Sequence, residues 1–352
     1  MNALPAVPAR PGRSTPTVRR SRRIGAAVTA VPAALLATRA LSDYGNNIVV
    51  AAAASVIIVS GLHLLIHWTG QISLAQVAFV AVGAFVTARA NGSWGVALEP
   101  AILLGAVAAA AASAVIGLPA LRIRGFPLAI STLAFGFAVD QYLLQQDWFS
   151  GGFRGLAIAP DAHLLGWSVE RGRQLVVPVV MVTALMVLIT AWLGRTAAGR
   201  ALRLVAADEN SALAHGYPVG ALKLVAFLYA AFCAGLAGGV MAAALGRVAY
   251  GTFSPQLSIG YVAAVLLGGE GPVWGSAAMG AALGAMPIWA GASLGKYTTL
   301  VSSLGILTML VMSSGGLNAT IRAVRQQLGA RRRWPDAEEL ADTEFGKGME
   351  LT

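Results

Sequence analysis

The chain has 352 residues, of which 57% are hydrophobic and only 11% are charged, against roughly 25% charged residues in ordinary soluble domains. This amount of polar surface is too small to cover a soluble globular protein. Most of the chain is therefore expected to face lipid. The net charge of +10 comes mainly from arginines in the two tails and beside apolar segments. No aromatic-rich basic groove accompanies them, which argues against nucleic-acid binding and leaves weak attraction to membrane lipid.

Apolar segments in chain order are candidates for membrane helices, each of which needs about 20 apolar residues. The two clearest, 175–193 and 224–246, contain no charged residue. Several others are short or rich in Gly and Pro, so some are expected to be re-entrant. We predict an all-α, polytopic membrane helical bundle with about 8–10 transmembrane or re-entrant segments. The remaining candidates are 24–41, 47–68, 71–88, 100–118, 126–145, 257–269, 273–291 and 298–316.

Arginine placement predicts the orientation, because cytoplasmic loops carry an excess of Lys and Arg. Both tails and the 195–223 loop are predicted to be cytoplasmic, and the mixed-charge 147–173 loop to lie outside. The chain then divides into a basic tail (1–23), a transmembrane domain (24–320) and a polar tail (321–352) that is expected to be disordered. Residues 19–42 also fit a cleaved export signal, but the missing cleavage site favours an uncleaved first membrane segment.

Polar residues interrupt two otherwise apolar segments. The stretch Gly70–Ala88 has no Asp, Glu, Lys or Arg, yet it begins with amides and a serine. Unpaired polar groups are costly in hydrocarbon, and for each residue alone a hydrogen bond between helices is the simpler explanation. Together with neighbouring glycines they predict a polar path through the bundle. These residues are Gln71, Ser73, Gln76, Ser131 and Thr132.

The 195–223 loop separates two clear spans, and its pattern predicts two short helices. Arg200 and Arg203 share one face of the first helix. Asp208 is predicted to cap the second helix, Gly216 to end it and Pro218 to prevent its continuation. Such helices suit docking of a peripheral protein, and an interfacial helix on lipid headgroups is the alternative. The apolar face of the first helix comprises Ala198, Ala201, Leu202, Val205 and Ala206.

The sequence predicts no catalytic set, cofactor or metal site. His63 and His67 are one helical turn apart, which is the spacing of metal ligands, but no third ligand is near and a polar pair at an interface is favoured. Residues 291–298 are only partly similar to a phosphate-binding loop, since Tyr297 replaces the Ser or Thr that would hold magnesium. If ATP drives transport, its hydrolysis is expected on another chain.

Five segments taken together resemble the permease subunits of bacterial branched-chain amino-acid ABC importers of the LivM type. The resemblance covers about residues 42–320. Ala75 and Gln76 stand where that family usually has Gly-His, and Phe137 replaces an acidic residue, which leaves the substrate open. The segments are 68–85 (family pattern GxxGQxSLGHAAFxGxGAY), 121–136 (LRxRGxYLAIxTLxFG), 150–156 (TGGxxGL), 199–216 (GRAxRAxRxxExAAxxxG) and 258–281 (SIxxxxxxxLGGxGxxxGxxxGA).

The resemblance implies a non-enzymatic subunit of the bacterial inner membrane that forms half of a translocation path. Its partners would be a second permease subunit, two cytoplasmic ATPase subunits and an external substrate-binding protein. The substrates would be branched-chain amino acids, or urea or short amides. The path residues would be Gly70, Gln71, Ser73, Gln76, Ser131 and Thr132, and the ATPase-coupling residues Arg200, Asp208, Glu209 and Gly216.

Two other classes of protein are alternatives to an importer subunit. A stand-alone, ion-coupled secondary transporter would need an ionisable residue within the membrane, for which Asp140 is the candidate. An integral membrane enzyme would need a constellation of carboxylate, histidine or serine side chains, and the sequence shows none.

Overall fold

The computed structural model describes residues 43–120, 126–168 and 172–294. The predicted spans 24–41 and 298–316, the arginine pair at 122 and 124, and both tails lie outside the described residues.

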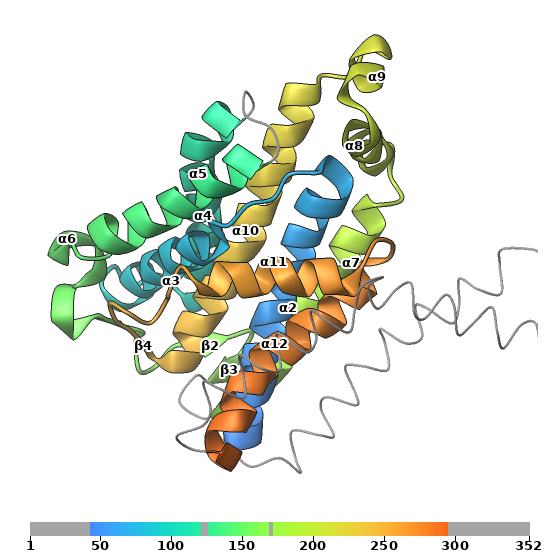
Figure 1. Cartoon of the computed structure of the whole chain (residues 1–352). Coiled ribbons are helices and arrows are strands. Elements are labelled where there is room, and N and C mark those ends of the chain that lie inside the picture. The colour runs from blue at the N-terminus through green and yellow to red at the C-terminus, as the bar shows by residue number, and fades with distance from the viewer. Residues whose placement is uncertain (1–42, 121–125, 169–171, 295–352) are drawn as a thin grey trace, which may run out of the picture.

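Long apolar helices form the body of the molecule (Figure 1). α10 (Val219–Leu245) runs through the middle and packs against α2 (Asp43–Thr69), α3 (Gln76–Gly92) and α4 (Leu98–Ala120). α2 also packs against α7 (Gly172–Leu193) and α12 (Val273–Leu294), and α11 (Leu257–Gly268) packs against α12. Because these helices are apolar on all sides, each can face lipid on one side and the bundle on the other.

Small residues let the helices approach closely. A Cβ atom at Gly238 of α10 would lie 2.0 Å from the carbonyl oxygen of Val80 in α3. One at Gly284 of α12 would lie 2.5 Å from the carbonyl oxygen of Ala51 in α2. Helices in lipid associate by such packing, since lipid tails are as apolar as leucine.

Four described helices are long and apolar enough to cross a membrane, and a bent pair of helices makes a fifth candidate. α11 has 12 residues, so at about 1.5 Å per residue it is about 18 Å long and cannot cross a hydrocarbon core of about 30 Å. The described part of the chain is thus a helical, polytopic membrane bundle. The four helices are Tyr44–Thr69, Leu98–Gly117, Leu175–Leu193 and Val219–Leu245; the bent pair is Pro127–Leu143 with Asp147–Arg154, at 88°.

Shorter elements complete the described part of the chain. The bent pair comprises α5 (Phe126–Ala138), the π-helical turn η1 (Val139–Leu143), α6 (Asp147–Ser150) and the 3-10 turn η2 (Gly152–Arg154). Two antiparallel strand pairs follow: β1 (Leu156–Ala157) with β4 (Arg247–Val248), and β2 (His163–Leu164) with β3 (Trp167–Ser168). α8 (Ala197–Ala207) and α9 (Glu209–Ala214) lie between α7 and α10.

The strand pairs and the α8–α9 loop are at opposite ends of the bundle (Figure 1). α7 runs from the end with β3 to α8, and α10 runs from α9 back to β4. Two membrane-length helices therefore separate the 147–168 region from the 195–218 region, as the charge pattern predicts. Which end faces the cytoplasm stays a prediction.

Candidate functional site

The segment 70–75 is a non-helical break between α2 and α3. The candidate segment 71–88 is therefore helical only from Gln76 onward, where α3 begins. Gly70 has a φ of +69°, which L side chains rarely adopt, and its N–H donates to the carbonyl oxygen of Ile66 at 3.1 Å. Gly70 thus ends α2 and lets the chain leave the helix axis.

Hydroxyl groups from neighbouring helices satisfy the backbone around this break. The N–H of Leu74 donates to Oγ1 of Thr132 at 2.9 Å, and the N–H of Val77 donates to Oγ of Ser258 at 3.1 Å. Irregular backbone in a membrane bundle is tolerated where protein groups or cavity water supply such partners. Two helices that are distant in sequence, α5 and α11, therefore supply hydrogen-bond acceptors to the backbone at the break and at the start of α3.

Three polar side chains are buried here: Gln71 and Ser73 in the break and Gln76 at the start of α3. Oε1 of Gln71 accepts a hydrogen bond from Oγ1 of Thr69 at 3.5 Å, and Oγ of Ser73 accepts one from the N–H of Ala75 at 3.4 Å. The amide of Gln76 is 1% exposed, and neither its nitrogen nor its oxygen has a partner among the described residues. Leaving a buried polar group unpaired costs about 1–3 kcal/mol, so this amide needs an explanation.

The structure thus brings most of the predicted path residues together at one place. Ser131 is the exception, since it is only half-buried and its hydroxyl donates to the carbonyl oxygen of Leu128 within the same helix. Sequence reasoning did not assign Ser258 to the site. The available signal was a serine at the start of the otherwise apolar segment 257–269.

The loop between α7 and α10 is a folded unit rather than a linker. Thr196 caps α8 by accepting a hydrogen bond from the N–H of Gly199 at 3.3 Å. Asp208 caps α9, accepting hydrogen bonds from Oγ of Ser211 at 2.7 Å and from the N–H of Asn210 at 2.9 Å. These hydrogen bonds hold the pKa of the Asp208 carboxyl below its ordinary value of 3.8. The predicted cap at Asp208 is confirmed.

The other predicted features of the loop are partly confirmed. Gly216 has a φ of +77° and follows the last turn of α9, as a helix-ending glycine should. In α8, Ala201, Leu202 and Val205 are buried, but Ala198 and Ala206 are exposed, so the predicted apolar face is narrower. Gly199 completes the buried face of α8. Because it has no side chain, the start of α8 can approach the end of α7 closely.

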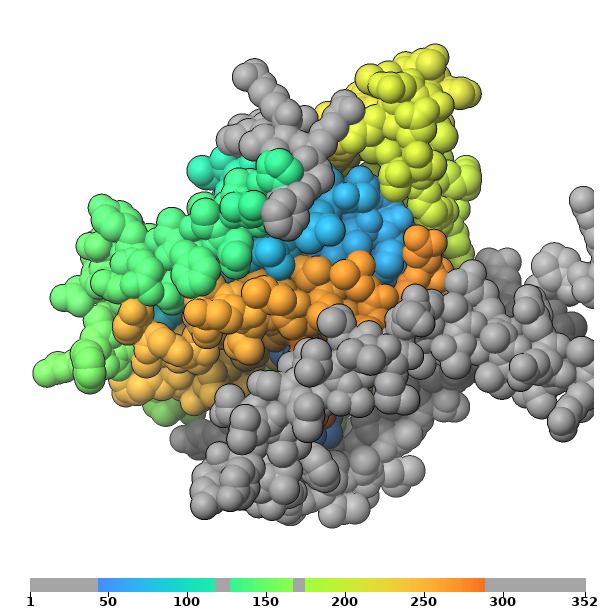
Figure 2. Space-filling model, viewed as in Figure 1, coloured from blue at the N-terminus to red at the C-terminus, as the bar shows by residue number. Residues whose placement is uncertain are grey.

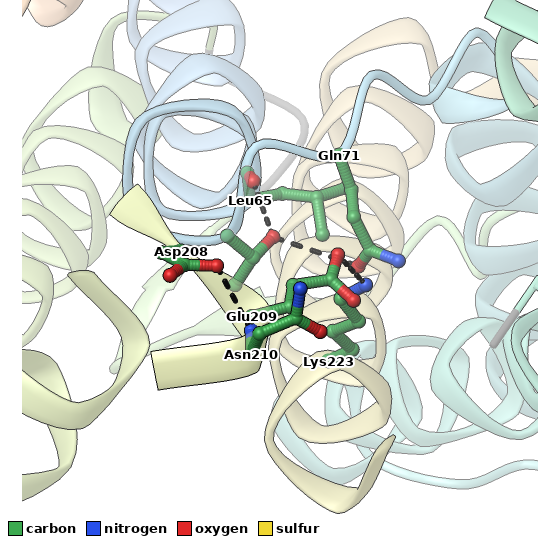
Figure 3. Close-up of polar contacts among 7 residues, drawn as sticks. Leu65, Gln71, Asp208, Glu209, Asn210 and Lys223 are labelled. Carbon is green, nitrogen blue, oxygen red and sulfur yellow. Dashed lines mark hydrogen bonds and ion pairs between the residues drawn. The ribbon is translucent and has the colours of Figure 1, made fainter. Parts of the chain in front are cut away.

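Two contacts hold α9 against α10. Val205, Ala212 and Val219 form a small apolar cluster of their own. Lys223, whose side chain is 4% exposed, donates a hydrogen bond to Glu209 in an ion pair (Figure 3). Sequence reasoning treated Lys223 only as the boundary of a span, because the predicted helix began at the next residue. The start of α10 at Val219 places this lysine inside the helix.

The loop also contacts the helix that leads into the break. α8 packs against α2, where the guanidinium of Arg203 lies 5.4 Å from the ring centroid of Trp68. Arg200 is exposed and donates to the carbonyl oxygen of Arg195 at 3.1 Å. In Figure 3 the side chain of Gln71 points toward the pair formed by Glu209 and Lys223. The α8–α9 loop therefore packs against the helix that leads into the break.

His63 and His67 join α2 to its neighbours. Nδ1 of His63 and Oγ of Ser276 share a hydrogen bond of 2.8 Å, and Nε2 of His67 lies 3.3 Å from the carbonyl oxygen of Val265. Within the described part of the chain, no group of three potential metal-ligating side chains is found.

The sequence profile of the branched-chain amino acid transport system permease component family matches residues 45–313. Two curated relatives are high-affinity branched-chain amino acid transport system permease proteins named LivM, from Salmonella typhimurium (strain LT2) and Escherichia coli (strain K12). Each is 30% identical over 234 residues, which cover 60% of this chain and 55% of the relative. The chain thus spans about half the length of these relatives. No solved structure matches it.

Proposed function

The chain belongs to the family of branched-chain amino acid transport system permease components, and we propose that it forms half of the translocation path of an ATP-driven importer. Its partners would be a second permease subunit, two cytoplasmic ATPase subunits that hydrolyse the ATP, and an external substrate-binding protein. We place it in the bacterial cytoplasmic membrane with both termini and the 195–223 loop on the cytoplasmic side. The relatives favour leucine, isoleucine and valine as substrates, ahead of urea or short amides.

The observation that carries this proposal is the folded α8–α9 loop. An ATPase on another chain can move the path only through a contact surface that is rigid enough to transmit force. Two capped helices, an apolar cluster and the Glu209–Lys223 pair give the loop this rigidity. The contact between Arg203 and Trp68 then ties the loop to α2, which ends at the break.

The break itself supports the proposed path. A backbone that leaves the helix inside an apolar bundle exposes polar groups where a substrate can exchange its hydration for protein contacts. The buried Gln76 amide, with no partner among the described residues, is suited to bind a polar group of the passing substrate. Its position at the first turn of α3 adds the positive end of the helix dipole.

The alternative is a secondary transporter, and the position of Asp140, its candidate ion-coupling residue, does not favour it. Asp140 lies in η1, next to the connection to α6, and its carboxylate accepts a hydrogen bond from the amide of Gln141 at 2.7 Å. An ion-coupling carboxylate would be expected near the middle of the bundle, paired across helices. Family membership also favours the importer.

Reconstitution tests the proposed function. The chain would be co-expressed with its candidate partner subunits, purified, and placed in proteoliposomes with labelled leucine and the binding protein outside. We expect uptake that requires internal ATP and the ATPase pair, with competition by unlabelled valine but little by urea. The matched control omits only the ATPase subunits. Strong uptake by the chain alone would reject the importer in favour of a carrier.

A further inference from the structure

A cavity of about 530 Å³ lies at the end of the bundle that carries α8. It is bounded by α8, by the C-terminal end of α2 and by the turn that joins α11 to α12. Figure 2 shows the orange α11–α12 turn beside the blue end of α2 and the yellow-green α8. The volume falls within the roughly 300–1,000 Å³ that is typical of small-molecule sites. None of the individual residues assigned above to the path or to coupling lines this cavity.

The cavity carries charges of both signs on different walls. Arg195 lies in the connection between α7 and α8, Arg203 lies in α8, and Glu270 comes from the α11–α12 turn. All three side chains are exposed, so their heads reach the solvent-filled space. A simple anion would gain nothing from Glu270, and a simple cation nothing from the arginines. A small zwitterionic ligand can pair its negative group with the arginines and its positive group with Glu270.

Arg203 is held in a fixed position at this cavity. Nη2 donates to the carbonyl oxygen of Gly194 at 2.7 Å, while the guanidinium stacks over Trp68. A guanidinium has five N–H donors, so groups remain to bind a carboxylate. Because the side chain is already ordered, binding loses less conformational entropy than it would with a free arginine.

Apart from His67, the rest of the lining is apolar or aromatic. Trp68 and Trp274 contribute ring surface, and Val273 and Ala191 contribute aliphatic surface. Trp274 is 42% exposed, so part of its ring is open to contact. An apolar group inside the cavity would cover this exposed surface and would be stabilised by the hydrophobic effect.

We propose that this cavity binds a free α-amino acid with an apolar side chain. Its carboxylate would pair with Arg195 and Arg203, its ammonium group with Glu270, and its side chain with the two tryptophans. The choice of leucine as the probe rests on the proposed function, whereas the zwitterionic specificity rests on the cavity alone. The bound molecule would sit between α8 and the helix that leads into the break, away from the path residues themselves.

Ligand-observed NMR in nanodiscs tests this site. The full chain would be titrated with L-leucine in the absence of the substrate-binding protein, with empty nanodiscs as the blank. Leucinamide, which lacks the carboxylate, and 4-methylpentanoate, which lacks the ammonium group, are matched analogues of similar size. Inorganic phosphate is the probe for a plain anion site. We expect saturable leucine binding that is at least about tenfold tighter than that of either analogue.

Three variants connect this binding to the cavity. Glu270→Gln should weaken leucine binding by at least about tenfold, because it leaves the ammonium group of the ligand unpaired. Arg203→Gln should weaken it by a similar factor, because the carboxylate then keeps only Arg195 and loses the arginine that is already ordered. Asp161→Asn, at the opposite end of the bundle, should bind like the native chain and is the matched control. Size-exclusion profiles would verify that all three variants fold.

Several results would overturn the inference. They are leucine binding that does not saturate, equal binding of 4-methylpentanoate or phosphate, or unchanged binding in the Glu270→Gln variant. Such results leave the proposed function standing if ATP-driven uptake by the full assembly is intact. Conversely, failed uptake with intact leucine binding rejects the importer proposal and keeps the cavity site.

Discussion

Replacing Glu209 with alanine should loosen the α8–α9 loop and uncouple transport. The substitution leaves the ammonium group of Lys223 without its ion-pair partner in a site where that side chain is only 4% exposed. Breaking a fully buried pair costs about 3–5 kcal/mol, and exposed pairs are worth about 0–1 kcal/mol. Glu209 is 21% exposed, so this pair lies between the two cases. We therefore expect breaking it to cost about 2–3 kcal/mol.

This free energy acts on the loop rather than on the whole bundle. A loss of about 2–3 kcal/mol raises the population of the opened loop by about 30- to 150-fold. We expect Glu209→Ala to insert in the membrane and to pair with the partner permease, yet to retain less ATPase through purification and to lose most uptake. Hydrogen exchange of residues 209–222 would report the opening directly.

A second substitution separates the two possible causes. In the double variant Glu209→Ala with Lys223→Met no charge is left unpaired, so loop protection and ATPase retention should recover substantially. If the double variant is as impaired as the single one, Glu209 acts by touching the ATPase rather than by holding Lys223. If Glu209→Ala keeps native hydrogen exchange and native uptake, the reasoning is refuted and the loop is a simple connector.

Other predictions concern orientation, the path and packing. With the native cysteine replaced, an impermeant thiol reagent applied to intact cells should label Ser168→Cys but not Ser211→Cys, and the opposite result reverses the orientation. Leucine at both Gln71 and Ser73 should leave insertion intact and strongly reduce uptake, since hydrogen-bonding groups at the break are lost; normal uptake would make these residues purely structural. Gly238→Ala should destabilise the purified chain by about 1–3 kcal/mol, because its Cβ would collide with a backbone carbonyl of α3, and an unchanged thermal midpoint would contradict the packing described here.

Much of this architecture follows from local sequence. A span such as 175–193 can be recognised because about 20 apolar residues have few alternatives to a membrane helix. The cap at Asp208 and the helix end at Gly216 could be predicted because their partners lie within a few residues. The five motif segments pointed to the family that the profile match then confirmed.

Other features depend on partners that are far apart in the chain. α3 begins at Gln76 rather than at 71 because hydroxyls from Thr132 and Ser258, 58 and 181 residues away from their backbone partners, satisfy the break. Lys223 is a span boundary in the sequence and a buried ion-pair partner in the fold, since α10 starts earlier than hydropathy indicates. The cavity brings together residues of three separate segments. Hydropathy and capping are local properties that the sequence alone determines, whereas burial and the choice of distant hydrogen-bond partners arise only when the helices pack.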